Sequence, residues 1–337
     1  MTAHDTLSRL GPLRLALVCA ATACSSGQVD DGDGKSVDSG TTAEEGEAEA
    51  EDDEAVDGLR PLAEVSGACP DLSTSGFVTF DSFGQERSTS IVVPSAPEPD
   101  MPIVFFFHGL MDPGSTPEPT EYMVSGLGLQ SLADTHNAVI VVPEAPIYTL
   151  FGFSFFLWDI ALETDADLVL FDDLRTCTAE QLDVDLTRTT AWGFSGGALW
   201  TTVMAAQRGD AFAAIVEASG GSDISVPIWS ELAAQYETPA YAMPALLISG
   251  GAADIWPSAS LTIVDFESAT DTLEAQLVED GHTVVSCHHN GGHSLPNPAY
   301  YLSIDWVMEH RFGEPSPWAD GDLGSDDGWC ELMHAGG

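Results

Sequence analysis

The sequence contains very few basic residues. Of its 337 residues, 54 are Asp or Glu but only 9 are Lys or Arg, and Lys35 is the only lysine. The formal net charge of −45 argues against binding to nucleic acid or anionic lipid, which both need a basic surface. Beyond Arg60 the chain has only these bases: Arg87, Arg175, Arg188, Arg208 and Arg311. We expect a solvated acidic surface that keeps the protein soluble. A more specific interpretation is that this surface is an adaptation to a saline medium.

Long hydrophobic runs are also absent, since a bilayer span needs about 20 apolar residues. The short apolar run at residues 15–23 follows Arg9 and Arg14, as in an export signal. Small residues then precede Cys24, which resembles the lipobox of bacterial lipoproteins except that Ala21 stands where Leu is usual. We expect residues 1–23 to be a lipoprotein signal peptide and Cys24 to be lipidated. Secretion after ordinary cleavage at the same site is the alternative.

Aromatic residues are missing from residues 25–60, where Glu, Asp and Ala predominate after residue 43. Such a segment cannot bury enough apolar surface to offset the entropy lost on folding. We therefore expect residues 24–60 to be a disordered acidic linker. Residues 61–337 are then of a size that suits one large folded domain. The protein would be tethered at the bacterial cell envelope or secreted, touching a membrane only through the lipid anchor.

Six cysteines are present, and Cys19 and Cys24 belong to the leader region. The remaining four are an even number in a chain expected to be exported, so we predict two disulfides. Their spacing does not resemble a zinc site, and we expect no metal. Three pairings are open, of which we favour one that joins the two ends of the domain through Cys69 and Cys330, leaving Cys177 and Cys287 as the second pair.

The hydrophobic pattern predicts strands that alternate with helices. Continuous apolar runs predict buried strands at residues 103–107, 138–142, 189–192, 212–216, 245–249 and 283–287, and two short strands precede them at 77–80 and 90–93. Helices are expected up to residue 133 and at residues 167–175, 198–207, 266–278 and 301–310. Residues 148–158 are expected to be an aromatic-rich loop, and the tail after Arg311 to be irregular. This order predicts an α/β fold with a mostly parallel sheet covered by helices on both faces.

The motif Gly193-Phe194-Ser195-Gly196-Gly197 falls between a predicted strand and a predicted helix. This context is typical of a nucleophilic serine on a sharp, strained turn. Bulky side chains two positions before or after the serine would obstruct such a turn, and glycines occupy both positions. The helix start behind Ser195 also offers N–H groups to developing negative charge. We interpret Ser195 as a nucleophile, the alternative being a glycine-rich structural turn.

A serine hydroxyl needs a base to act as a nucleophile. The downstream candidates are His282, His288, His289, His293, His310 and His334. We favour His293, because it lies in a glycine-containing loop after the last predicted parallel strand, at the same sheet edge as Ser195. His288 and His289 are the alternatives, since they lie nearer the end of that strand.

The base needs an orienting carboxylate, and Asp254 follows the predicted strand at residues 245–249 in a glycine-opened loop. It stands between Ser195 and His293, and the order Ser, Asp, His is the one that α/β-hydrolases use. Asp265 and Glu267 are alternatives, but they fit the first turn of a helix better. Because the chain is so acidic, the alternative that Asp254 is simply a solvated surface residue stays open.

An oxyanion hole needs two N–H donors. One is expected from Gly196, directly after the nucleophile, and the other from Leu110 in the loop after the strand at residues 103–107, with Gly109 or Met111 as alternatives. We expect His108 to hold this loop by hydrogen bonds. Trp158 and Trp256 lie near the same edge, where they either line an acyl pocket or, as we expect, pack in the core.

About 200 residues resemble extracellular esterases of the polyhydroxybutyrate depolymerase and feruloyl esterase type, which have the α/β-hydrolase fold. The matching pieces are Phe107-His108-Gly109, Trp158 before a helix with Asp172-Asp173, residues 192–198, residues 251–254 and residues 291–296. The sequence departs from the depolymerases at Gly196, where they usually carry Asn. We expect no separate polymer-binding domain after the hydrolase domain.

The resemblance implies a serine hydrolase that cleaves small or polymeric carboxylic esters without a cofactor. Polyhydroxyalkanoate and feruloyl-type esters are the substrates it suggests. A serine peptidase on the same scaffold is one alternative. The other is a catalytically inactive surface lipoprotein that uses the inherited fold to bind a ligand or partner.

Overall fold

The computed structural model describes residues 56–150, 152–224, 234–258, 261–326 and 328–334. The compact unit that these residues form begins at Val56. The expected signal peptide, the lipidation site Cys24 and nearly all of the expected linker lie outside the described residues, so they stay predictions. None of the helices in the described ranges combines the length and the apolar character that crossing a membrane requires.

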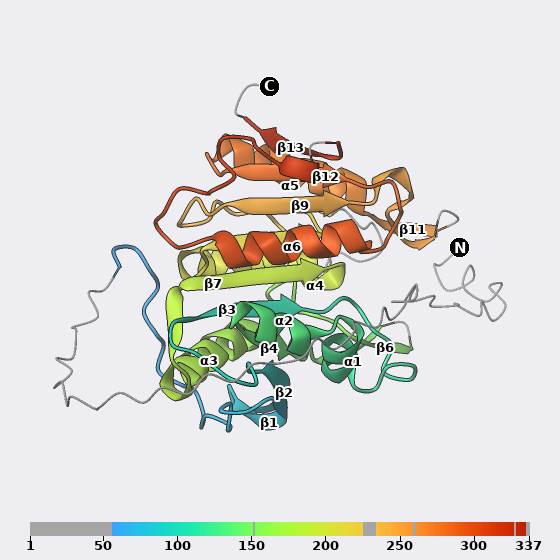
Figure 1. Cartoon of the computed structure of the whole chain (residues 1–337). Coiled ribbons are helices and arrows are strands. Elements are labelled where there is room, and N and C mark those ends of the chain that lie inside the picture. Colours follow the sequence, from blue (N-terminus) through green and yellow to red (C-terminus); the bar gives the residue numbers. More distant parts are fainter. Residues whose placement is uncertain (1–55, 151, 225–233, 259–260, 327, 335–337) are drawn as a thin grey trace, which may run out of the picture. The chain divides into compact units, whose positions relative to one another are not determined.

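A nine-stranded sheet forms the centre of the described unit, with strand order β1-β2-β4-β3-β7-β8-β9-β12-β13 (Figure 1). The six strands from β4 to β12 run parallel, while β1, β2 and β13 pair antiparallel at the two edges. The strands are β1 (Gly76–Ser82), β2 (Gln85–Val92), β3 (Met101–Phe107), β4 (Val139–Pro143), β7 (Val184–Phe194), β8 (Ala214–Ala218), β9 (Ala245–Ser249), β12 (Val284–His288) and β13 (Cys330–Met333).

Helices cover both faces of this sheet because its central strands are apolar on both sides. In β3, Phe105 and Phe107 pack into one core with α3, α4 and α5, while Phe106 packs into the other core with α2 and α6. The helices are α1 (Pro119–Gly126), α2 (Leu129–His136), α3 (Ala166–Gln181), α4 (Gly196–Arg208), α5 (Phe266–Glu279) and α6 (Asn297–Glu309), with short 3-10 turns η3 (Gly209–Ala211), η4 (Gly251–Ala253) and η5 (Gly324–Asp326). The predicted α/β architecture is confirmed.

The aromatic segment expected as a loop is a β-hairpin of β5 (Ile147–Leu150) and β6 (Phe153–Phe156). Gly152 takes a positive φ of 84° beside the turn, a conformation that suits glycine. Met111 bridges to Phe156, so the hairpin is fastened to the loop after β3. A second hairpin, β10 (Ile255–Ser258) with β11 (Leu261–Asp265), follows Asp254. The expectation of an irregular tail was also wrong, because β13 adds an edge strand there.

Two disulfides are present, as predicted, but the favoured pairing was wrong. Cys69 bonds Cys177, which ties the segment before β1 to α3. Cys330 bonds Cys287, its direct neighbour in the antiparallel pairing of β13 with β12. The ends of the domain are therefore not joined to each other, since the register of an edge strand, not the position of a cysteine along the chain, brings the sulfur atoms together.

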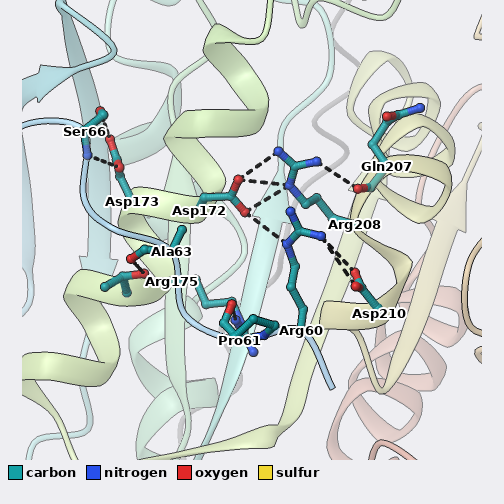
Figure 2. A network of polar contacts seen from close by, with 11 residues as sticks. Arg60, Pro61, Ala63, Ser66, Asp172, Asp173, Arg175, Gln207, Arg208 and Asp210 are labelled. Atoms are coloured by element: carbon teal, nitrogen blue, oxygen red, sulfur yellow. Dashed lines mark hydrogen bonds and ion pairs between the residues drawn. The ribbon is translucent and has the colours of Figure 1, made fainter. Parts of the chain in front are cut away.

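An ion-pair network holds the start of the described unit against α3 and η3 (Figure 2). Arg60 lies 3.3 Å from a carboxylate oxygen of Asp210 and 3.6 Å from one of Asp172, and Arg208 lies 2.8 Å from Asp172. Further along, the amide of Ser66 donates to Asp173 at 2.8 Å. Arg60, the last residue of the expected linker, therefore makes ion pairs with the folded unit.

The other described arginines also make structural contacts. Arg87 pairs with Asp167 at 2.6 Å, and both side chains are buried. Arg311 pairs with Asp185 at 2.6 Å, while Arg175 and Arg188 donate to backbone carbonyls. The few arginines of the domain thus make contacts within the fold. They do not neutralise the negative charge of the remaining acidic residues.

Candidate active site

Ser195 stands on a sharp turn between β7 and α4. Its backbone has φ 56° and ψ −124°, a strained conformation for a residue other than glycine. A Cβ atom at Gly197 would overlap the carbonyl of Phe107, and one at Gly193 would overlap the carbonyl of Gly197. The strand–turn–helix context expected for the motif is present, and close backbone contact explains why glycine occupies both positions.

His293 and Asp254 lie next to Ser195 in space. His293 Nε2 is 2.9 Å from Ser195 Oγ, and His293 Nδ1 is 2.7 Å from Asp254 Oδ1. Asp254 follows β9 and His293 follows β12, and these strands run parallel to β7, so all three residues meet at one edge of the sheet. The structure therefore brings together the three side chains expected from the sequence.

The carboxylate of Asp254 is completely buried. While Oδ1 faces His293, Oδ2 lies 2.8 Å from both the Ser219 hydroxyl and the Gly250 amide, which donate to it. A buried carboxylate needs such donors, because leaving its oxygens unpaired costs free energy. Asp254 is thus a fixed and hydrogen-bonded acid, which rules out the interpretation as a solvated surface aspartate.

The alternative histidines have other partners. His288 contacts Ser249 Oγ through Nδ1 at 2.7 Å, and His289 Nδ1 accepts from the Gly291 amide at 3.0 Å. His282 and His310 are buried and bonded to backbone carbonyls. Within the described ranges, His293 is the histidine whose ring nitrogen is hydrogen-bonded to Ser195.

Two aromatic rings stack on the imidazole of His293. The ring centroid of Phe266 is 4.5 Å from that of His293 and the planes differ by 13°, while Phe194 stacks at 5.1 Å and 28°. Phe266 begins α5 and is 3 % exposed. These contacts limit how far the imidazole can tilt. Sequence reasoning missed Phe266, since nothing in its local pattern distinguishes it from a core residue.

The loop after β3 passes directly beside Ser195. A Cβ atom on Gly109 would lie 3.1 Å from Ser195 Cβ, and one on Gly196 would lie 3.2 Å from the Leu110 amide nitrogen. Gly196 is the first residue of α4, so its N–H has no acceptor within its own helix. The amides of Gly196 and Leu110 therefore belong to adjacent backbone segments next to Ser195.

His108 holds this loop in place through hydrogen bonds of its ring. The residue is fully buried, and burial lowers the pKa of its imidazole to about 4, so the ring is neutral. Nε2 accepts from the Ala145 amide at 3.1 Å, which leaves Nδ1 to donate to the Gly109 carbonyl at 2.8 Å. The Trp158 indole donates to the His108 carbonyl at 2.9 Å and is itself buried in the core. His108 holds the loop by hydrogen bonds, and Trp158 packs in the core, each as expected.

One group of side chains in the described chain has donor atoms close enough to share a metal ion. Asp271, Glu274 and His288 offer ligand atoms that all lie within 4.8 Å of one another. Two of the three side chains are exposed, and with 54 acidic residues in the chain carboxylates are expected to meet by composition alone. None of these three residues belongs to the hydrogen-bonded set of Ser195, His293 and Asp254.

Comparison with solved structures supports the architecture. The chain matches native pOPH with a TM-score of 0.60 and native sOPH with 0.59, each at 15 % identity over 80 % of this chain and 98 % of the other. A complex of a substituted pOPH with pNPB matches with a TM-score of 0.59 at 15 % identity, over 81 % and 98 %. The chain has the α/β-hydrolase fold. At this identity the likeness concerns the fold alone, and no family model and no curated protein matches the sequence.

Proposed function

We propose that the protein is a serine hydrolase that cleaves carboxylic esters with Ser195, His293 and Asp254. The observation that carries this proposal is the continuous chain of hydrogen bonds from Ser195 Oγ through His293 to the buried Asp254. Nucleophile, base and orienting acid recur in this arrangement on unrelated folds that catalyse acyl transfer. The strained turn under Ser195 supports the same role, because it presents the hydroxyl at the sheet edge.

The proposed reaction has two halves. His293 Nε2 takes the Ser195 proton as Oγ attacks the ester carbonyl, and the imidazolium is held by Asp254. The amides of Gly196 and Leu110 donate to the oxyanion. The C–O bond then breaks, the alcohol leaves with the proton from His293, and an acyl-enzyme remains. Water attacks this acyl group with His293 again as base, which releases the acid and restores Ser195.

Esters are favoured over peptides by the sequence resemblance, and a neighbouring structure, pOPH, is seen with pNPB. Polyhydroxyalkanoate and feruloyl-type esters are the specific substrates we propose. The net charge of −45 argues against strongly anionic ones. The rival proposal of an inactive binding lipoprotein is disfavoured by the hydrogen-bonded geometry of all three side chains, since binding alone does not require it.

Export is part of the proposal. Two disulfides suit an oxidising compartment, because cytosolic thiols are normally kept reduced. We propose a bacterial cell-envelope location through a lipid on Cys24, or secretion if that cysteine is not modified. Mass spectrometry of the mature protein from a bacterial host tests this. A diacylglyceryl mass on an N-terminal Cys24 supports the anchor, and an unmodified N-terminus means secretion.

The activity is tested with p-nitrophenyl esters of increasing chain length, a feruloyl ester and a polyester film, each with the wild type and Ser195→Ala. We expect the wild type to hydrolyse at least one ester class and Ser195→Ala to be inactive. A fluorophosphonate probe should label the wild type at Ser195 only. A wild type that neither hydrolyses any ester nor reacts with the probe would overturn the proposal in favour of a binding role.

A further inference from the structure

Ser219 lies in a turn directly after β8 and contacts the acid of the candidate triad. Its side chain is 1 % exposed, and its hydroxyl donates to Asp254 Oδ2 at 2.8 Å. The Gly250 amide is the other donor to the same oxygen, also at 2.8 Å. Because Oδ1 is used by His293, these two donors fix how the carboxylate is rotated and leave Oδ1 aimed at the imidazole.

The backbone of Ser219 has a strained conformation. Its φ is 53°, in the left-handed region that glycine adopts without cost. Its amide donates to the Ile248 carbonyl at 2.7 Å, so the turn is also fastened to β9, six residues before Asp254 in the sequence. A serine at this position, where glycine would be less strained, places a hydroxyl against Asp254.

The segment that contains Ser219 also contacts Ser195. The carbonyl of Ala218, next to Ser219, accepts from the Ser195 amide at 2.9 Å. One short segment therefore contacts both the nucleophile's backbone and the carboxylate of Asp254. Neither β7 nor β9 alone provides this link, because each strand is followed by only one of the two residues.

A closed ring of hydrogen bonds holds the turn in place. Thr202 Oγ on α4 lies 2.8 Å from the Gly221 carbonyl and 3.0 Å from Glu217 Oε1, while the Gly221 amide donates to Glu217 Oε2 at 3.1 Å. One hydroxyl hydrogen cannot serve both oxygens. If Thr202 donates to Gly221, a protonated Glu217 donates to Thr202 and completes the ring. Glu217 is 1 % exposed, so this neutral form suits its surroundings.

We infer that Ser219 is a positioning residue of the proposed hydrolase, which holds the Asp254 carboxylate so that His293 stays aligned with Ser195. The inference rests on the proposed function. Without the Ser219 hydroxyl, one buried acceptor site of Asp254 loses its donor, and among the described residues only the Gly250 amide still donates to that oxygen. The imidazole is then oriented less strictly and the imidazolium formed during catalysis is less well placed.

The test compares Ser219→Ala and Ser219→Gly with the matched control Ser222→Ala. Ser222 is also 1 % exposed and lies in the same segment, but its hydroxyl contacts Gln276 at 2.5 Å and not Asp254. Loss of a hydrogen bond to a charged group predicts that kcat falls about 10- to 100-fold in both Ser219 variants, with KM within about twofold. Ser222→Ala should keep the wild-type kcat.

Two further measurements separate positioning from folding. Ser219→Gly removes the hydroxyl but relieves the positive φ, so its melting temperature should not fall below that of Ser219→Ala while its kcat remains low. The downfield proton resonance of the His293–Asp254 hydrogen bond should shift or broaden in both Ser219 variants and not in Ser222→Ala. Wild-type kcat in the Ser219 variants, or an unchanged resonance, would overturn the inference. A wild type without esterase activity or probe labelling would instead overturn the proposed function.

Discussion

The ring of Phe266 lies nearly parallel to that of His293, with centroids 4.5 Å apart and planes 13° apart. Phe266 comes from the first turn of α5, and its amide donates to the Asp254 carbonyl at 2.9 Å. The residue therefore contacts the proposed base through its side chain and the proposed acid through its backbone. This arrangement places an apolar ring against the imidazole, which has to keep one orientation in the proposed mechanism.

We expect Phe266→Leu to lower kcat several-fold, because leucine fills similar volume but offers no flat surface for the imidazole. Phe171→Leu is the control, since Phe171 is equally buried but packs against Phe105 and Phe212. Each change should destabilise the fold by roughly 1 kcal/mol as a conservative core substitution. Equal kcat values for the two variants, at comparable melting temperatures, would contradict a role for Phe266 at the base.

The assignment of the base can be tested by comparing two histidines. His293→Ala should lower kcat by about four to six orders of magnitude, because members of a triad act as a unit. His289→Ala should stay close to the wild type, since its ring contacts the Gly291 amide and not Ser195. Steady-state kinetics with one p-nitrophenyl ester are sufficient. An inactive His289→Ala beside an active His293→Ala would show that the wrong histidine was chosen.

Glu217 predicts a specific pH dependence of stability. Burial raises the pKa of its carboxyl from 4.5 to about 8. Between these two values the folded protein binds a proton that the unfolded chain has lost, so the free energy of unfolding falls as the pH rises, by up to about 1.4 kcal/mol per pH unit. This contribution is fully present below about pH 4.5 and is lost as the pH rises through about 8.

Glu217→Gln removes the titration but can keep the ring, because the amide donates to Thr202 and accepts from Gly221 as the neutral acid does. The melting temperature of Glu217→Gln minus that of the wild type should therefore increase from pH 4.5 to pH 8 and then level off. Other titrating groups are common to both proteins and cancel in the difference. A difference that is independent of pH would show that Glu217 is ionised in the folded protein.

The acidic surface predicts stabilisation by salt. Carboxylates crowded on a compact fold repel each other, and every described arginine is already engaged in a structural contact. Screening shortens the Debye length from about 10 Å at 0.1 M to about 3 Å at 1 M. The melting temperature should rise from 0.05 to 1 M NaCl, most steeply at the low end. Sodium chloride is used because sulfate also strengthens apolar burial. A flat or falling curve would exclude the saline-medium interpretation.

The sequence by itself determined the class of fold and the positions of the three candidate catalytic residues. Apolar runs separated by helical segments predict a parallel sheet, and the carboxyl ends of parallel strands meet at one edge. Ser195, Asp254 and His293 each follow such a strand, so their meeting could be foreseen without coordinates. The glycines around Ser195 are a local signal, because the turn that needs them is made within five residues.

Only the tertiary structure decided which distant residues touch. The pairing of Cys287 with Cys330 depends on the register of β13 against β12, and the hairpin of β5 and β6 meets Met111 from the loop after β3. Ser219 reaches Asp254 across 35 positions of sequence, and Phe266 reaches His293 from a different element. A serine or phenylalanine carries no local sign of such a partner, since contacts of this kind arise from how strands and helices pack and not from the pattern along one segment.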